Sequence, residues 1–160
     1  MTVARPLPHD AAPLHVTGQA RYVDDIPVPF GTLHLAFGTS PVAAGRILSM
    51  DLEAVRRAPG VVAVLAHADL PRDCDVSPAA HDEPLLADGE VHYVGQAVFL
   101  VVAESHLAAR HAARLGRVEI EQTRPILTID EALAAGSHFE GGPITWSRGD
   151  TEAALTAAAH

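Results

Sequence analysis

The stretch AVFLVVA at residues 97–103 is the longest run in the chain that consists of hydrophobic residues alone, without a proline or glycine. A short apolar run with no polar face is typical of a strand that is covered on both sides. It is far shorter than the roughly 20 residues that a membrane-spanning helix requires. The sequence of 160 residues therefore predicts one compact core with a buried strand at residues 97–103, and no transmembrane segment.

The segment ahead of that run, EVHYVGQ at residues 90–96, is more polar and ends with Gly95 and Gln96. A glycine between a half-exposed segment and a buried strand most often marks a bulge or a tight bend. Gln96 supplies neither a nucleophile nor a base. We therefore interpret Gly95-Gln96 as a bend where the chain enters the core, rather than as the edge of a reaction site.

Further alternating or apolar segments predict strands, and capping residues predict short helices between them. The expected strands lie at residues 33–37, 46–50, 61–66 and 117–121. The expected helices follow Asp51, Ser105, Thr128 and Asp150, and the third of them should end at Gly136. The strand, helix and strand between residues 97 and 121 suggest a βαβ-like unit.

The helix after Ser105 is predicted to bury one face and expose the other. Its inward stripe should consist of Leu107, Ala108, His111, Ala112 and Leu115, and its outward face of His106, Arg110 and Arg114. His111 is thus interpreted as a partly buried core histidine with one hydrogen bond, rather than as a metal ligand.

The basic residues and the single cysteine exclude several classes of chemistry. All 11 basic residues are arginine, so a P-loop, a Schiff-base lysine and a biotin or lipoyl attachment site are all excluded. The net charge of −9, without a basic stripe, argues against a nucleic acid partner. Cys74 is the only cysteine, which excludes an internal disulfide and any cysteine-rich metal site. With no apolar signal segment at the start, these features favour a cytoplasmic location.

The polar groups do not form a recognisable reaction site. The chain has ten histidines, but His106 and His111 are five residues apart and diverge by about 140° around a helix. The acid pairs Asp24-Asp25 and Asp82-Glu83 are adjacent in sequence, where side chains usually point apart and stay solvated. Residues 141–143, Gly-Gly-Pro, indicate a turn without the context of a dinucleotide site. We nominate no catalytic, cofactor-binding or metal-ligating residue.

The ends of the chain and one internal segment are predicted to make contacts elsewhere. Residues 1–20 read as an extended N-terminal arm, residues 21–149 as the domain, and residues 150–160 as the start of a helix. Because a helix of that length with Leu155 as its only large apolar side chain is marginal alone, we expect the natural polypeptide to continue. The acidic segment at residues 71–90 is long for a loop, and with the proline-rich arm it is a candidate for contact with a neighbour.

Three segments occur together in an order and at spacings typical of one protein family. They are HVTGQARYVDDIP at residues 15–27, APGVVAVLAHADLP at 58–71 and GEVHYVGQAVFLVVAESHLAARHAA at 89–113. They resemble the N-terminal α/β-hammerhead domain of the molybdopterin-binding subunit of the xanthine dehydrogenase and aldehyde oxidase family. The resemblance runs from about Arg5 to the turn at Gly149-Asp150. It implies an α+β fold of the hammerhead type, with a mixed sheet and short flanking helices in a single domain.

Two features place the chain near one branch of that family. The opening PLPHDAAPLHVTGQARYVDDIP resembles the bacterial xanthine dehydrogenase branch. The segment FGTSPVAAGRI at residues 37–47 keeps Ser40 and Arg46 but lacks the arginine and histidine typical of the carbon monoxide dehydrogenase branch. Aldehyde oxidase, carbon monoxide dehydrogenase and other molybdenum hydroxylases remain alternatives, as does a stand-alone metal-binding protein that uses its histidines.

The resemblance also implies a parent enzyme and its cofactors. Such a parent hydroxylates xanthine to urate, with NAD as the final electron acceptor. The molybdenum cofactor would lie in later domains of the same subunit, and FAD with a pair of 2Fe–2S clusters in a smaller partner subunit. This fragment would then be a structural domain without a cofactor of its own, within a heteromeric complex that binds neither nucleic acid nor membrane.

Overall fold

The computed structural model describes residues 4, 6–71, 74–78, 81–138 and 142–159. The chain divides into two compact units, Met1–Leu33 and His34–His160. The first unit contains helix α1 (Ala12–Val16) and the 3-10 turn η1 (Val23–Asp25). Pro13 stands in the first turn of α1, where its missing N–H costs no hydrogen bond. The N-terminal arm thus contains a helical turn that the sequence analysis did not predict, while the predicted limits at residues 20 and 149 stay predictions.

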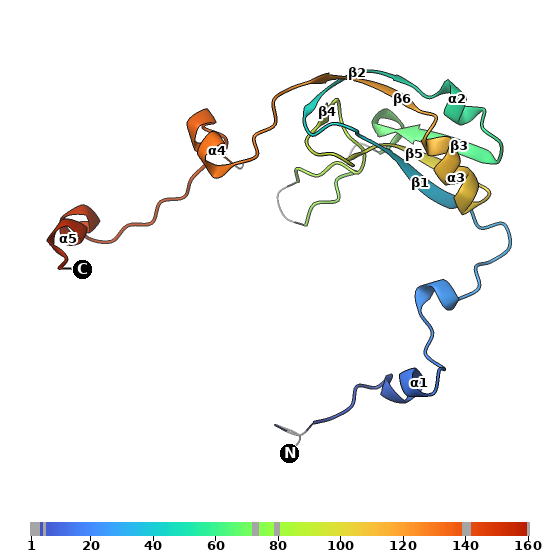
Figure 1. Cartoon of the computed structure of the whole chain (residues 1–160), viewed down its shortest axis with the longest axis horizontal. Helices are drawn as coiled ribbons and strands as arrows, with labels where there is room; N and C mark the ends of the chain where they lie inside the picture. The colour runs from blue at the N-terminus through green and yellow to red at the C-terminus, as the bar shows by residue number, and fades with distance from the viewer. Residues whose placement is uncertain (1–3, 5, 72–73, 79–80, 139–141, 160) are drawn as a thin grey trace. The chain divides into compact units, whose positions relative to one another are not determined.

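The buried strand predicted at residues 97–103 is confirmed and lies in the middle of an antiparallel sheet (Figure 1). The strands are β1 (His34–Thr39), β3 (Val61–Ala66) and β5 (Ala97–Ala103), in the order β1-β5-β3. Val98, Val101 and Ala103 on β5 are fully buried. This first sheet therefore has β1 and β3 as its edges, because β5 pairs with both of them.

The other strands of the described residues form a second antiparallel sheet. They are β2 (Gly45–Asp51), β4 (Glu90–Val91) and β6 (Arg117–Gln122), in the order β4-β2-β6. The expected α+β class with short flanking helices is confirmed, but the strands form two antiparallel sheets and not one mixed sheet. The βαβ-like unit is wrong, because β5 and β6 lie in different sheets, whereas a βαβ unit joins parallel neighbours in one sheet.

Helices α2 (Glu53–Arg56) and α3 (His106–Ala113) flank the strands. The predicted inward stripe of α3 is right for Ala108 and Ala112, which are half-buried and buried, and wrong for its three large members, which are exposed. The buried residues of α3 are Ala109 and Ala112, while His111 is exposed and Leu107 is 64% exposed. The helix contacts β1 and β5. Small alanine side chains allow a helix to approach a sheet closely, so this face packs against the strands although it is less apolar than the predicted one.

The side chains of strand β1 also point to the opposite faces from those that the alternating sequence pattern suggests. Its large apolar residues Leu35 and Phe37 are 56% and 49% exposed, whereas Ala36 is half-buried and Gly38 is buried. The side of β1 that the rest of the fold covers accommodates small residues only. Two large apolar side chains of an edge strand therefore face outward.

The core is organised around the ring of Phe99 on β5, which is 2% exposed. The ring lies close to the backbone of two glycines. A Cβ atom on Gly38 would come within 2.0 Å of the Phe99 Cζ, and one on Gly116 within 2.3 Å of the same atom. Leu86, in the acidic segment at residues 71–90, is also fully buried. The core thus depends on a large ring that only glycines at these positions accommodate.

The last two helices begin at their predicted caps. They are α4 (Ile129–Ala135) and α5 (Thr151–Ala157). Thr128 accepts the Glu131 N–H, Asp150 accepts the Ala153 N–H, and Gly136 ends α4 with a φ of 62°. None of the helices in the described ranges is long and apolar enough to cross a membrane.

We predict that the start of α4 loosens in acid. Hydrogen bonds from the Leu127 N–H, then from Arg124 and Thr128, hold the pKa of Glu131 below its usual value of 4.5. Because the carboxylate is favoured in the folded chain, this stabilisation is present above the usual pKa and is lost as the pH falls through the lowered one. NMR titration of the Glu131 carboxyl and of the Ala132 amide should show this, and Glu131→Gln should abolish the transition. A Glu131 that titrates at its usual value would contradict the prediction.

Candidate functional site

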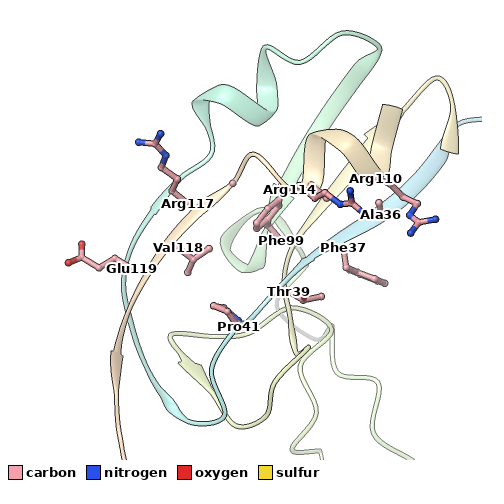
Figure 2. Close-up of a pocket in the computed structure, with 13 residues that line it drawn as sticks. Ala36, Phe37, Thr39, Pro41, Phe99, Arg110, Arg114, Arg117, Val118 and Glu119 are labelled. Atoms are coloured by element: carbon pink, nitrogen blue, oxygen red, sulfur yellow. The ribbon is translucent and has the colours of Figure 1, made fainter. Parts of the chain in front are cut away.

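The β1–β6 groove is a hollow of about 750 Å³ next to the C-terminal end of α3 (Figure 2). Its wall on one side is strand β1, and its wall on the other is the start of β6. Gly116 turns the chain from α3 into β6 and places these two walls near each other. The residues that define it here are Phe37, Gly38, Phe99, Arg114, Gly116 and Val118.

The β1–β6 groove is positively charged at its rims. Arg110 comes from α3 and Arg114 from the C-cap of that helix, whereas Arg117, at the start of β6, extends away from the groove in Figure 2. None of these three guanidinium groups forms an ion pair with another residue that the structure describes. The carboxylate of Glu119, which also borders the groove, accepts a hydrogen bond from the Ser49 hydroxyl at 3.1 Å and extends away from the groove in Figure 2. The local charge is thus opposite in sign to the net charge of −9.

The groups in this groove are suited to binding rather than to acid–base or nucleophilic chemistry. Its lining residues include no histidine, cysteine or serine. Arginine stays protonated at neutral pH and donates hydrogen bonds only, so it serves as neither a base nor a nucleophile. The sequence analysis placed Arg110 and Arg114 on one outward face but missed Arg117, since nothing in the sequence indicates that β6 lies beside β1.

The bend at Gly95-Gln96 is confirmed. Gly95 has a φ of 92°, in the left-handed region that favours glycine. Gln96 is 6% exposed, and its side-chain oxygen accepts the His92 N–H at 2.6 Å. Its backbone oxygen accepts the Ser40 N–H at 2.8 Å, and the Ser40 oxygen accepts the Gly95 N–H at 2.8 Å. Gln96 therefore fastens the bend to the end of β1, and its role is structural.

Replacing Gln96 with alanine is expected to lower the free energy of unfolding by about 1–3 kcal/mol. The change removes the nearly buried Gln96 side chain and takes the acceptor away from the His92 N–H in a partly buried hydrogen bond. Chemical denaturation measures the effect. Gln122→Ala, at an exposed position on β6, is the matched control and should stay within about 0.5 kcal/mol of the parent. Equal effects at both positions would contradict the structural role of Gln96.

The histidines that the structure describes do not come together as a set of metal ligands. The rings of His34 and His106 lie edge to face with centroids 6.3 Å apart, and His111 is exposed, not partly buried as expected. Across the described residues, no group of three histidine, cysteine, aspartate or glutamate side chains could hold a metal ion. His106 and His34 thus form a pair on the surface of the first sheet.

The acid pairs take different local roles. Asp25 accepts the Tyr22 N–H at 2.9 Å and caps η1. Asp82 and Glu83 are exposed. Nearby, a hydrogen bond from the Ser77 hydroxyl holds the pKa of Asp75 below its usual value. Of the predicted turn at residues 141–143, residue 141 lies outside the described residues.

Comparisons with known proteins agree with the architecture. A model of the family described as "Aldehyde oxidase and xanthine dehydrogenase, a/b hammerhead domain" matches residues 17–124. A xanthine dehydrogenase of Drosophila pseudoobscura pseudoobscura is 39% identical over 160 residues, which are 99% of this chain and 12% of the relative.

Two solved structures share the fold. The aldehyde oxidoreductase of Desulfovibrio desulfuricans has a TM-score of 0.74 and 28% identity over 86% of this chain and 17% of its own. A Cu,Mo-CO dehydrogenase has a TM-score of 0.70 and 32% identity over 79% of this chain and 16% of its own.

The chain spans only 12% of the length of the xanthine dehydrogenase that it matches. The family match covers strands β1 to β6 and helices α2 and α3, which are the elements that build both sheets. The chain therefore belongs to the aldehyde oxidase and xanthine dehydrogenase family, as an a/b hammerhead domain.

Proposed function

We propose that the chain is a structural domain at the N-terminus of the molybdenum-binding subunit of a xanthine dehydrogenase. The observation that carries this proposal is the 39% identity to a xanthine dehydrogenase along 99% of the chain. The parent enzyme would hydroxylate xanthine to urate with oxygen from water and transfer the electrons to NAD. The chain itself would supply shape and contacts to that enzyme.

A non-catalytic role is supported by the chemistry of the described side chains. Ser40 and Gln96 are the buried polar residues of the described part, and both have hydrogen-bond partners in the fold. With no group of three potential ligands among those residues, the donor set does not fit a resident metal. By resemblance to the family, the molybdenum cofactor would be held by later domains of the same subunit, and FAD and the pair of 2Fe–2S clusters by a partner subunit. Molybdenum is part of the name of the Cu,Mo-CO dehydrogenase that shares this fold, which supports a molybdenum cofactor in the parent enzyme.

Contacts with neighbouring domains are supported by large apolar side chains on the surface. In the first unit, Val16, Val23 and Phe30 are 86%, 84% and 107% exposed. Near the other end, Ile144 and Trp146 are 81% and 92% exposed. Exposed apolar groups of this size are typical of surfaces that a partner covers. We infer that the N-terminal arm and the residues that follow it to Leu33, with the acidic segment at residues 71–90, contact the other domains and the smaller subunit in a heteromeric cytoplasmic complex.

The proposal is tested with the natural polypeptide that contains this chain, purified through a tag added at the chromosomal gene. We expect it to contain molybdenum, iron and flavin, and to reduce NAD when xanthine is added. The absence of molybdenum, or failure to oxidise any purine, would contradict the proposal.

The alternative within the family is an enzyme for aldehydes or carbon monoxide, since structures of both kinds share this fold. The same preparation distinguishes the alternatives when xanthine, an aromatic aldehyde and carbon monoxide are offered in parallel. We expect the specificity constant, kcat/KM, to be largest for xanthine. A larger value for either of the other substrates would assign the domain to the other branch.

A further inference from the structure

We propose that the free edge of β1 binds an extended, acidic segment of a partner polypeptide, which adds to the sheet as a further strand. The inference rests on the residues of this chain and does not depend on the proposed activity. It concerns the β1–β6 groove described above.

Strand β1 has an open hydrogen-bonding edge. In the described part of the chain, β1 pairs with β5 alone, so its other edge presents backbone N–H and C=O groups without strand partners. The strand has six residues, HLAFGT, and carries no proline, lysine or acid. Proteins usually protect edge strands with such residues or cover them, because an unprotected edge pairs with other chains. This edge is therefore suited to strand addition.

The two faces of β1 differ in the size and exposure of their side chains. Leu35 and Phe37 are 56% and 49% exposed on one face. The other face, with Ala36 and Gly38, lies on the side that the fold covers. Successive side chains of a strand point to opposite faces, so an added strand would place every second side chain beside Leu35 and Phe37. Those side chains should be apolar.

Positive charge lies where the alternate side chains of the added strand would point. Arg110 and Arg114 extend from α3, which contacts β1, and Figure 2 shows Arg114 beside the ring of Phe99. Since neither of these two is ion-paired with any residue in the described ranges, carboxylates on the incoming strand would meet positive charge. Arg117 extends from the outer face of β6 and does not take part. The recognised segment therefore alternates apolar and acidic residues.

Two simpler explanations account for only part of this arrangement. Arginines at the C-terminal end of α3 complement the dipole of that helix, but this role leaves the open strand edge and the exposed Leu35 and Phe37 unexplained. A small anion such as phosphate would pair with the guanidinium groups, but it would leave the open strand edge and the exposed Leu35 and Phe37 unused. An extended polypeptide uses all three features at once.

The test measures binding of short fluorescent peptides to the 160-residue chain by anisotropy. The probe is a peptide of about eight residues that alternates glutamate and valine, since this is the length of an ordinary strand. We expect saturable binding that weakens as salt increases, and no binding of the matched lysine–valine peptide. A glutamate–valine peptide with N-methyl groups along one edge should bind at least tenfold more weakly, because it cannot pair with β1.

Variants of the chain localise the site. The double variant Arg110→Gln/Arg114→Gln should bind the peptide about tenfold more weakly, and Phe37→Ser should also weaken binding. Arg56→Gln, an exposed arginine on α2, is the matched control and should bind as the parent does. Hydrogen exchange of the β1 amides should slow when the peptide is bound.

Several outcomes would overturn the proposal. They are equal binding of the lysine and glutamate peptides, equal binding of the N-methylated peptide, and competition by inorganic phosphate at concentrations at which chloride has no effect. Protection of the β1 amides by self-association alone would show that a second copy occupies the edge, and would overturn it as well.

Discussion

Replacing Phe99 with alanine is expected to lower the free energy of unfolding of the 160-residue chain by about 3–5 kcal/mol. The side chain is 2% exposed, and its ring fills the space between β1 and the turn at Gly116. Deleting a buried ring removes its transfer energy and leaves a cavity that the surrounding structure closes only in part. Chemical denaturation monitored by circular dichroism measures the change.

The matched control is Phe37→Ala, which removes the same ring from the neighbouring strand. Because Phe37 is 49% exposed, its loss should cost less than half as much as the loss of Phe99. Equal effects for the two phenylalanines would show that the core is not organised around Phe99.

Replacing Gly38 with alanine is expected to destabilise the chain by about 3 kcal/mol or more, although the change adds a single methyl group. The new Cβ would lie 2.0 Å from the Phe99 Cζ, far inside a van der Waals contact. Because the ring is enclosed by other core residues, either the ring or strand β1 must move. The expected result is a lower denaturation midpoint, or a lower yield of folded protein.

Combining this change with Phe99→Ala identifies the cause. Once the ring is absent, the extra methyl group has space, so the double variant should be no less stable than Phe99→Ala alone. Gly89→Ala is the comparison, since Gly89 has a φ of 76° and no atom within 4 Å of the added Cβ. Its cost of about 1–2 kcal/mol comes from the backbone and should not change when Phe99 is removed. Additive costs for Gly38→Ala and Phe99→Ala would contradict the steric explanation.

Local signals in the sequence predicted the elements well. The uncharged run at residues 97–103 coincides with β5, and the caps at Ser105, Thr128 and Asp150 precede α3, α4 and α5. These signals act within a few residues of the backbone that they organise. A capping side chain bonds an N–H two or three positions away, so its effect does not depend on the rest of the fold.

Contacts between distant segments were not predictable in the same way. The sequence pattern placed Leu35, Phe37 and Leu107 inside, whereas the structure exposes all three and buries Gly38 and Ala109 in their place. Close approach of α3 to β1 and β5 selects small side chains, and the approach distance is a property of the assembled fold. Hydrophobicity alone therefore indicates the wrong face where packing is closest.

The β1–β6 groove could not be predicted from the sequence for the same reason. The groove is bordered by Arg110, Arg114 and Arg117, which come from two parts of the chain. These arginines border one groove because β5 and β6 lie in different sheets. The sequence analysis instead suggested a βαβ-like unit, in which β6 would pair beside β5. Pairing between strands depends on the fold as a whole, and no short stretch of this sequence specifies it.

The most direct test of the central claim is to purify the 160-residue chain alone and measure its metal content together with xanthine oxidation. If the chain supplies structure to a larger molybdenum enzyme, the preparation should be folded, contain no stoichiometric molybdenum, iron or zinc, and form no urate, while the natural polypeptide forms urate under the same conditions. A bound redox centre in the isolated chain, or oxidation of a purine by it, would contradict that claim.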